Sequence, residues 1–208
     1  MIPFDILLLF TTASMALAIT PGPDNIFVLA QSALYGRKTG LLITFGLCTG
    51  LLVHIGAVAL GVAAILQKSV LAFNALKMAG IGYLLYLAWQ AFRADGIEPN
   101  GRENGPMGGW ALYARGIVMN VTNPKVAIFF LAFLPQFAGP ARGSVPLQIA
   151  LLGIVFMISA LVVFGCIAWA ASRIGQWLRN SKRAHLAMNR GAGSVFLLLA
   201  GHLALSRQ

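Results

Sequence analysis

Two stretches, Ile19-Thr20-Pro21-Gly22-Pro23-Asp24-Asn25 and Asn120-Val121-Thr122-Asn123-Pro124-Lys125, place a proline directly before a charged residue inside otherwise apolar sequence. Proline lacks a backbone N–H and clashes with the preceding turn, so a helix is expected to break at each stretch. The carbonyls of Leu17, Ile19 and Asn120 then lose their partners within the helix. Inside a bilayer, freed backbone groups and ions must be satisfied by protein, water or ligand, which makes both breaks candidate functional sites.

The composition is that of a membrane protein. Of the 208 residues, 59% are hydrophobic and 10% are charged, whereas about 25% are charged in an average soluble domain. The first apolar segment carries Asp5 and no basic residue near its start, so we expect it to be retained rather than cleaved as a signal peptide. The net charge of +10 does not indicate nucleic-acid binding, because the bases lie in short loops where anionic lipid headgroups attract them.

Six apolar segments are long enough to cross a bilayer as helices. Segment 94–112, between the third and fourth of them, is rich in Gly, Pro, Asn and charge, which is typical of a solvated linker. The sequence therefore predicts an all-α integral membrane protein whose first and fourth helices are broken by proline. Residues 1–93 form one three-helix repeat and residues 113–208 the other. The predicted spans are 2–34 with a break at 20–25, 40–66, 70–92, 113–137, 145–172 and a weaker 186–205.

The distribution of Lys and Arg predicts the orientation of these spans. Ten bases lie in the first, third and fifth loops and only three, Lys68, Arg142 and Arg207, on the opposite side. Base-rich short loops stay in the cytoplasm, so the linker is predicted to be cytoplasmic and both termini periplasmic. Counted along a helix from the cytoplasmic bases, Asp24 and Lys125 lie roughly 15–20 Å deep. Two repeats of opposite orientation, with broken helices that meet near the midplane, are typical of secondary transporters.

Several features have a second, purely structural interpretation. A buried salt bridge between Asp24 and Lys125 would hold two kinked helices together without any transport role. His54, in the second span, is a candidate for lining the pathway or relaying protons, but equally for donating to a neighbouring backbone. Gly46 and Gly50 have the small-xxx-small spacing that lets two helices approach closely.

The motifs resemble those of a known family. Asn123-Pro124-Lys125-Val126-Ala127-Ile128-Phe129-Phe130, then Leu134-Pro135-Gln136-Phe137, together with Thr20-Pro21-Gly22-Pro23, are similar to the LysE/RhtB superfamily of bacterial amino-acid exporters. The resemblance covers the whole chain in length and span number, and its motifs are concentrated in the first span and in 115–137. It implies a homodimeric exporter of amino acids or their analogues in the bacterial inner membrane. The implied driving force is proton antiport.

The chemistry of the breaks agrees with such a substrate, because an amino acid is a zwitterion. Lys125 and the amides after Pro124 can receive its carboxylate, while Asp24 and the freed carbonyls can receive its ammonium. Of the five acids, Asp24 alone is expected at the centre of the membrane, so Asp24, with His54, is the candidate proton carrier. The predicted substrate site is completed by the residues that flank the breaks, namely Thr20, Pro23, Asn25, Asn123 and Pro124.

Two other classes of protein were weighed against an amino-acid exporter. A membrane enzyme needs a nucleophile with its base or a metal cluster, which the three histidines do not provide in this pattern. A metal-ion exporter of the same superfamily needs several Cys, His or carboxylate ligands together in the membrane, where only Asp24, Cys48 and His54 are available. No cofactor and no resident metal is expected.

Overall fold

The computed structural model describes residues 2–66 and 108–180, with isolated helical positions between 75 and 93 and between 190 and 204. No strand occurs among these described residues. The predicted third span at 70–92 and sixth span at 186–205 are covered only by isolated helical positions. Most of the linker 94–112 and the C-terminus lie outside the described residues.

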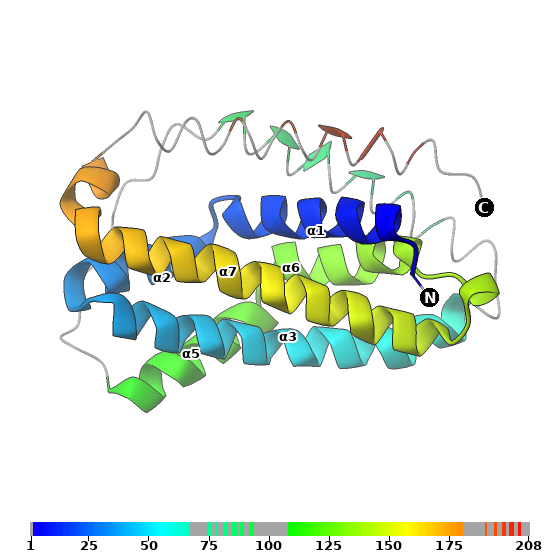
Figure 1. Cartoon of the computed structure of the whole chain (residues 1–208), viewed down its shortest axis with the longest axis horizontal. Coiled ribbons are helices and arrows are strands. Elements are labelled where there is room, and N and C mark those ends of the chain that lie inside the picture. Colours follow the sequence, from blue (N-terminus) through cyan, green and yellow to red (C-terminus); the bar gives the residue numbers. More distant parts are fainter. Residues whose placement is uncertain are drawn as a thin grey trace.

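Both proline-containing spans are broken, as predicted. Helices α1 (Phe4–Ile19) and α2 (Pro23–Tyr35) form one pair, bent by 62°, and the second break bends the chain by 49°. There α5 (Gly109–Val121) is followed by the short α6 (Pro124–Ile128), a π-helical turn at Phe129–Phe133 and a 3-10 turn at Leu134–Phe137. The second and fifth predicted spans are the continuous helices α3 (Arg37–Leu66) and α7 (Val145–Asn180), shown in Figure 1.

The helices pack side by side, with α3 along both α5 and α7, and α7 also against α1 and α2 (Figure 1). Glycines make the α3–α5 contact close, as the sequence predicted. A Cβ at Gly46 would overlap the backbone carbonyl of Tyr113, and one at Gly116 would stand 2.5 Å from the carbonyl oxygen of Ile43. The two backbones therefore touch, which brings the end of α5 against α3.

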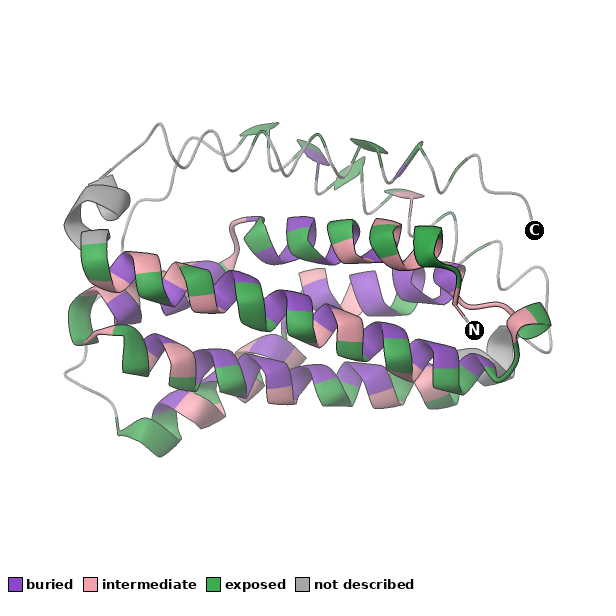
Figure 2. Ribbon diagram, viewed as in Figure 1, coloured by how far each residue is buried: buried purple, intermediate pink, exposed green. Residues whose placement is uncertain are grey.

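The outward faces of these helices are as apolar as the inward faces. On α7, Leu147 and Ile158 are 60% and 57% exposed, whereas Leu152 and Phe156 on the other face are buried (Figure 2). A helix that is apolar all round requires an apolar surrounding, here the lipid. Arg37–Gly61 and Val145–Arg173 are each long and apolar enough to span a membrane, and each bent pair qualifies when it is counted as one span. The described residues therefore contain two to four membrane spans.

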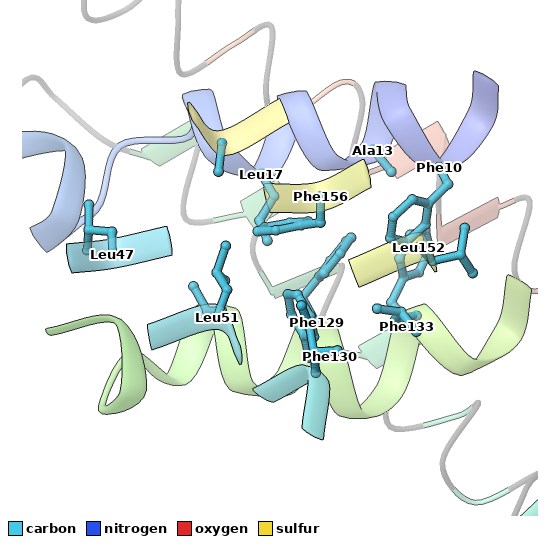
Figure 3. Packing of buried hydrophobic residues seen from close by; sticks show 14 of the residues in the cluster. Phe10, Ala13, Leu17, Leu47, Leu51, Phe129, Phe130, Phe133, Leu152 and Phe156 are labelled. Carbon is cyan, nitrogen blue, oxygen red and sulfur yellow. The ribbon is translucent and has the colours of Figure 1, made fainter. Parts of the chain in front are cut away.

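A cluster of buried aromatic side chains holds the second broken segment against α1 and α7. The ring of Phe10, on α1, lies 5.2 Å from that of Phe137, and Phe130 meets Phe156 of α7 edge to face at 4.9 Å. Figure 3 shows Phe156 near Leu17 of α1, and the rings of Phe129 and Phe130 pack against Phe156 at 5.4 and 4.9 Å. Because this packing places the segment after Pro124 beside α1, the two breaks meet in the middle of the bundle.

Candidate functional site

At the first break, side chains satisfy the last carbonyls of α1. The backbone N–H and the hydroxyl of Thr20 both donate to the carbonyl of Ala16, at 2.9 and 2.7 Å. Asn25 donates from Nδ2 to the carbonyl of Ala18 at 2.6 Å. Pro23 then starts α2, in the position where its missing N–H costs no helical bond. The break thus joins a capped C-terminus of α1 to an N-terminus of α2 that begins with proline and has no side-chain cap.

Lys125 crosses from the second break to the end of α1. Its ammonium donates to the carbonyls of Leu17 and Thr20, at 3.2 and 2.9 Å. A cation is stabilised at a helix C-terminus, where the free carbonyls and the helix dipole are negative. Gly22 leaves the room for it, because a Cβ there would lie 3.2 Å from Nζ. The second acceptor is Thr20 and not Ile19. Of the two carbonyls that we expected to receive the substrate's ammonium, Lys125 therefore occupies that of Leu17.

Asp24 and Lys125 are connected through Asn123 rather than by a hydrogen bond to each other. Asp24 is 2% exposed and lies in the first turn of α2, where the positive end of the helix dipole stabilises a carboxylate. Its Oδ2 accepts a hydrogen bond from Nδ2 of Asn123 at 2.8 Å. Asn123 also caps α6, since its Oδ1 accepts from the backbone N–H of Lys125 at 3.0 Å. One amide therefore ties the start of α2 to the start of α6.

His54 supports the second break from α3. Its Nε2 lies 3.2 Å from the carbonyl oxygen of Asn120, near the end of α5. A carbonyl oxygen only accepts, so Nε2 carries the proton in this contact. Asn120 is one of the residues whose carbonyl the proline was expected to free, and the structure favours the backbone-capping interpretation of His54.

A small cavity of about 20 Å³ lies between the two breaks, α3 and α7. Its polar lining is Asp24, Asn120 and Lys125, and apolar side chains that include Leu51 and Phe156 complete it. Asp24 and Asn120 are 2% and 3% exposed, and none of the described residues bonds to Oδ1 of either. The structure thus places two buried, unpartnered oxygens at one cavity.

The sequence analysis named Asn120 only for its carbonyl, and its side chain is an addition to the site. The signal for it was a second asparagine close to the break, since Asn120 is the next-to-last residue of α5. Pro23 and Pro124 are exposed and act on the backbone, as the first residues of α2 and α6.

In the part of the chain that the structure describes, no group of three or more His, Cys, Asp or Glu side chains stands close enough to hold a metal ion.

Two broken helices that bring an acid and a base together inside an apolar bundle define an integral membrane transport protein. Known proteins refine this class. Residues 15–207 match the LysE type translocator family, and the chain belongs to that family. Its members are translocators, so the protein is a transporter and not an enzyme. The chain is 33% identical to the homoserine/homoserine lactone efflux protein of Salmonella typhimurium over 198 residues, which are 95% of each chain.

Two further relatives cover nearly as much of the chain. The homoserine/homoserine lactone efflux protein of Salmonella typhi is 32% identical over 198 residues, again 95% of each chain. An uncharacterized membrane protein of Vibrio cholerae is 32% identical over 191 residues, which are 91% of this chain and 92% of that protein. No solved structure matches the chain.

Proposed function

We propose that this protein exports small neutral amino acids or their analogues across the bacterial inner membrane. The observation that carries the proposal is the buried Asp24, whose Oδ1 is unpartnered among the described residues and lines a cavity between two helix breaks. A carboxylate in that position can receive a substrate's ammonium group. The names of the two Salmonella relatives support the substrate class, since homoserine and its lactone both carry an amino group beside a carbonyl carbon.

The lining of the cavity favours a substrate with an uncharged side chain. Asp24 and Lys125 are the two charged residues of the lining, and most of the others are apolar, Leu51, Phe156 and Phe164 among them. A second charged group on the substrate would be buried against apolar atoms without a partner, which is strongly unfavourable. A short neutral or hydroxyl-bearing chain avoids that cost.

Transport requires the site to open. The cavity of about 20 Å³ has room for about one water molecule and is too small for an amino acid. We propose that the bent pairs α1–α2 and α5–α6 are equivalent parts of two inverted three-helix repeats, which together supply six spans and rock about the site.

The proposal includes a homodimer with both termini in the periplasm. Reporters fused after Gln208 and within 140–144 should then be extracytoplasmic, and a cytoplasmic signal at Gln208 would contradict the inverted arrangement.

We propose proton antiport as the driving force, with Asp24 as the group that exchanges the proton and His54 as its candidate partner. The remaining residues of the site, Thr20, Pro23, Asn25, Asn123, Pro124 and Lys125, shape and cap the breaks around the substrate. The charge of Asp24 and the donors beside it support this assignment. Export coupled to protons needs a buried group that alternates between two protonation states, and such groups are carboxylates or histidines in most pumps and transporters.

Counterflow in proteoliposomes tests the proposed function. Vesicles loaded with unlabelled homoserine should accumulate external labelled homoserine, and an imposed pH gradient should drive net transport without a counter-substrate. The variant Ser159→Ala should transport as the unmodified protein does. The Ser159 hydroxyl is buried in α7 and donates to the carbonyl of Val155 at 2.8 Å, so the variant controls for the loss of a buried hydrogen bond. Counterflow absent for a panel of small neutral amino acids would contradict the proposal.

A further inference from the structure

Buried acceptors at the cavity lack donors. Asp24 and Asn120 both line the cavity, and Oδ1 of each has no hydrogen-bond partner in the described part of the chain. Oδ1 of the neighbouring Asn25 is also buried without one. A buried acceptor without a donor is unfavourable, so the cavity favours a ligand that brings donors.

The donors of Asn123, Asn25 and Lys125 are committed to the protein. Nδ2 of Asn123 donates to Asp24, and Nδ2 of Asn25 donates to the carbonyl of Ala18. The ammonium of Lys125 donates to two carbonyls at the end of α1. To meet a substrate carboxylate, Lys125 would have to leave these carbonyls and expose the negative end of α1 inside the membrane.

A primary ammonium group fits what the cavity lacks. It offers three N–H donors and one positive charge. The cavity, about 20 Å³, has the size that one water-sized group needs. A carboxylate offers only acceptors, so it cannot satisfy the unpartnered oxygens of Asp24 and Asn120. The unpartnered oxygens of Asp24 and Asn120 thus favour the ammonium end of a substrate.

We propose that the cavity between Asp24 and Asn120 is a subsite for a primary ammonium group, and that Lys125 is a clamp between α1 and α6 rather than a carboxylate receptor. The protein then binds short primary amines and carboxyl-blocked amino acids as well as zwitterions. This inference rests on the proposed function for transport and extends its substrates to primary amines that have no carbonyl group at all. Asn120 becomes a substrate-contacting residue of the site.

A set of four ligands tests the inference on the unmodified protein. Purified protein in nanodiscs binds labelled homoserine in competition with its lactone, with 3-aminopropan-1-ol, which lacks the carboxylate, and with 4-hydroxybutanoate, which lacks the amino group. We expect the lactone and the amine to compete within about tenfold of homoserine. The hydroxy acid should be weaker by about a hundredfold or more, because a site built for an N–H donor rejects an analogue without it. Competition by the hydroxy acid but not by the amine overturns the inference.

The outcomes separate the inference from the proposed function. If 3-aminopropan-1-ol stabilises the protein in a thermal-shift assay while no amino acid is transported, the ammonium subsite stands and amino-acid export fails. If homoserine is transported and only 4-hydroxybutanoate competes with it, export stands and the subsite fails. If none of the four compounds binds and none is transported, both are wrong.

Three variants place the subsite on named residues. Asn120→Leu keeps the size of the side chain and removes its oxygen, so it should weaken binding of homoserine and of the amine by a similar factor, about tenfold. Ser159→Ala, outside the cavity lining, should leave both affinities unchanged.

Lys125→Met should leave the ranking of amine over hydroxy acid as it is in the unmodified protein. A selective loss of homoserine affinity in Lys125→Met, with amine affinity retained, shows that Lys125 receives the carboxylate and overturns the clamp; if that variant does not fold, the four-ligand comparison decides alone.

Discussion

The two helix breaks are built alike and differ in how their charges are stabilised. In each, a threonine hydroxyl bonds the carbonyl one turn back at 2.7 Å, Thr20 to Ala16 and Thr122 to Val118, and a proline starts the next helix. The bends are 62° and 49°. The residue directly after each proline is charged, an acid in the first break and a base in the second.

An acid and a base at the same position of a helix meet opposite conditions. Asp24 lies at a helix N-terminus, which stabilises it where it stands. Lys125 lies at an N-terminus that repels it, and its long side chain reaches the C-terminus of α1 instead. Each charge is therefore balanced by a helix end, and Asn123 bridges the two. The comparison suggests that the acid is available to substrate and proton while the base is structural.

The largest effect is expected at the acid. Asp24→Asn keeps the size of the side chain and much of its hydrogen bonding, but it cannot exchange a proton. Transport driven by a pH gradient should fall by about a hundredfold or more, since an intramembrane ionisable group is lost, while expression and membrane insertion stay intact. Transport assays in liposomes measure the first quantity and membrane fractionation the second. Undiminished gradient-driven transport would remove Asp24 from the mechanism.

The charge swap tests whether the two residues are a simple ion pair. In the double variant Asp24→Lys with Lys125→Asp, a carboxylate at position 125 has no proton to donate to the carbonyls of Leu17 and Thr20. We therefore expect transport no better than that of the weaker single variant. Recovery of a substantial part of the activity in the double variant would show that a direct pair of opposite charges is all that the site requires.

A smaller effect is expected at His54, whose ring bonds the end of α5. His54→Ala removes one donor to the carbonyl of Asn120, which keeps a hydrogen bond from the backbone N–H of Asn123 at 3.0 Å. The loss should lower stability by about 0.6–2 kcal/mol, the usual range for hydrogen bonds between membrane helices. Thermal unfolding in detergent measures the change, and His54→Gln, which keeps a donor, should recover part of it. If transport fails completely in His54→Gln while stability is normal, His54 carries protons and is more than a cap.

The smallest effect is expected at Gly22. Its backbone is extended, at φ −161°, so alanine is tolerated there, but the added Cβ would lie 3.2 Å from Nζ of Lys125. This crowding should cost about 1 kcal/mol. It should loosen the contact of Lys125 with the end of α1 and so reduce transport severalfold. Gly56→Ala is the matched control, because nothing stands within 4 Å of a Cβ at that position. Equal transport by the two variants would mean that Lys125 adapts without cost.

The helix positions were predictable where a local rule decides them. Proline and apolar length predicted both breaks and the courses of α3 and α7, although α7 continues to Asn180, beyond the predicted end at residue 172. Segment 173–180 is more polar, so hydropathy ended the predicted span before the helix ends. The partners across the site were not predictable. Which carbonyls Lys125 reaches depends on how α1 and α6 pack, and no spacing along the chain encodes that.

The close crossing of α3 and α5 has a mechanical consequence. Where Gly46 and Gly116 meet, backbone lies against backbone, and there are no side-chain rotamers through which the contact can adjust. Interdigitated side chains can shift in small steps, whereas two touching backbones must move as one piece or separate. In the proposed opening, we therefore expect α3 and α5 to move as one unit that carries Asn120, at the end of α5, while the segments beyond the two prolines change their angle to it.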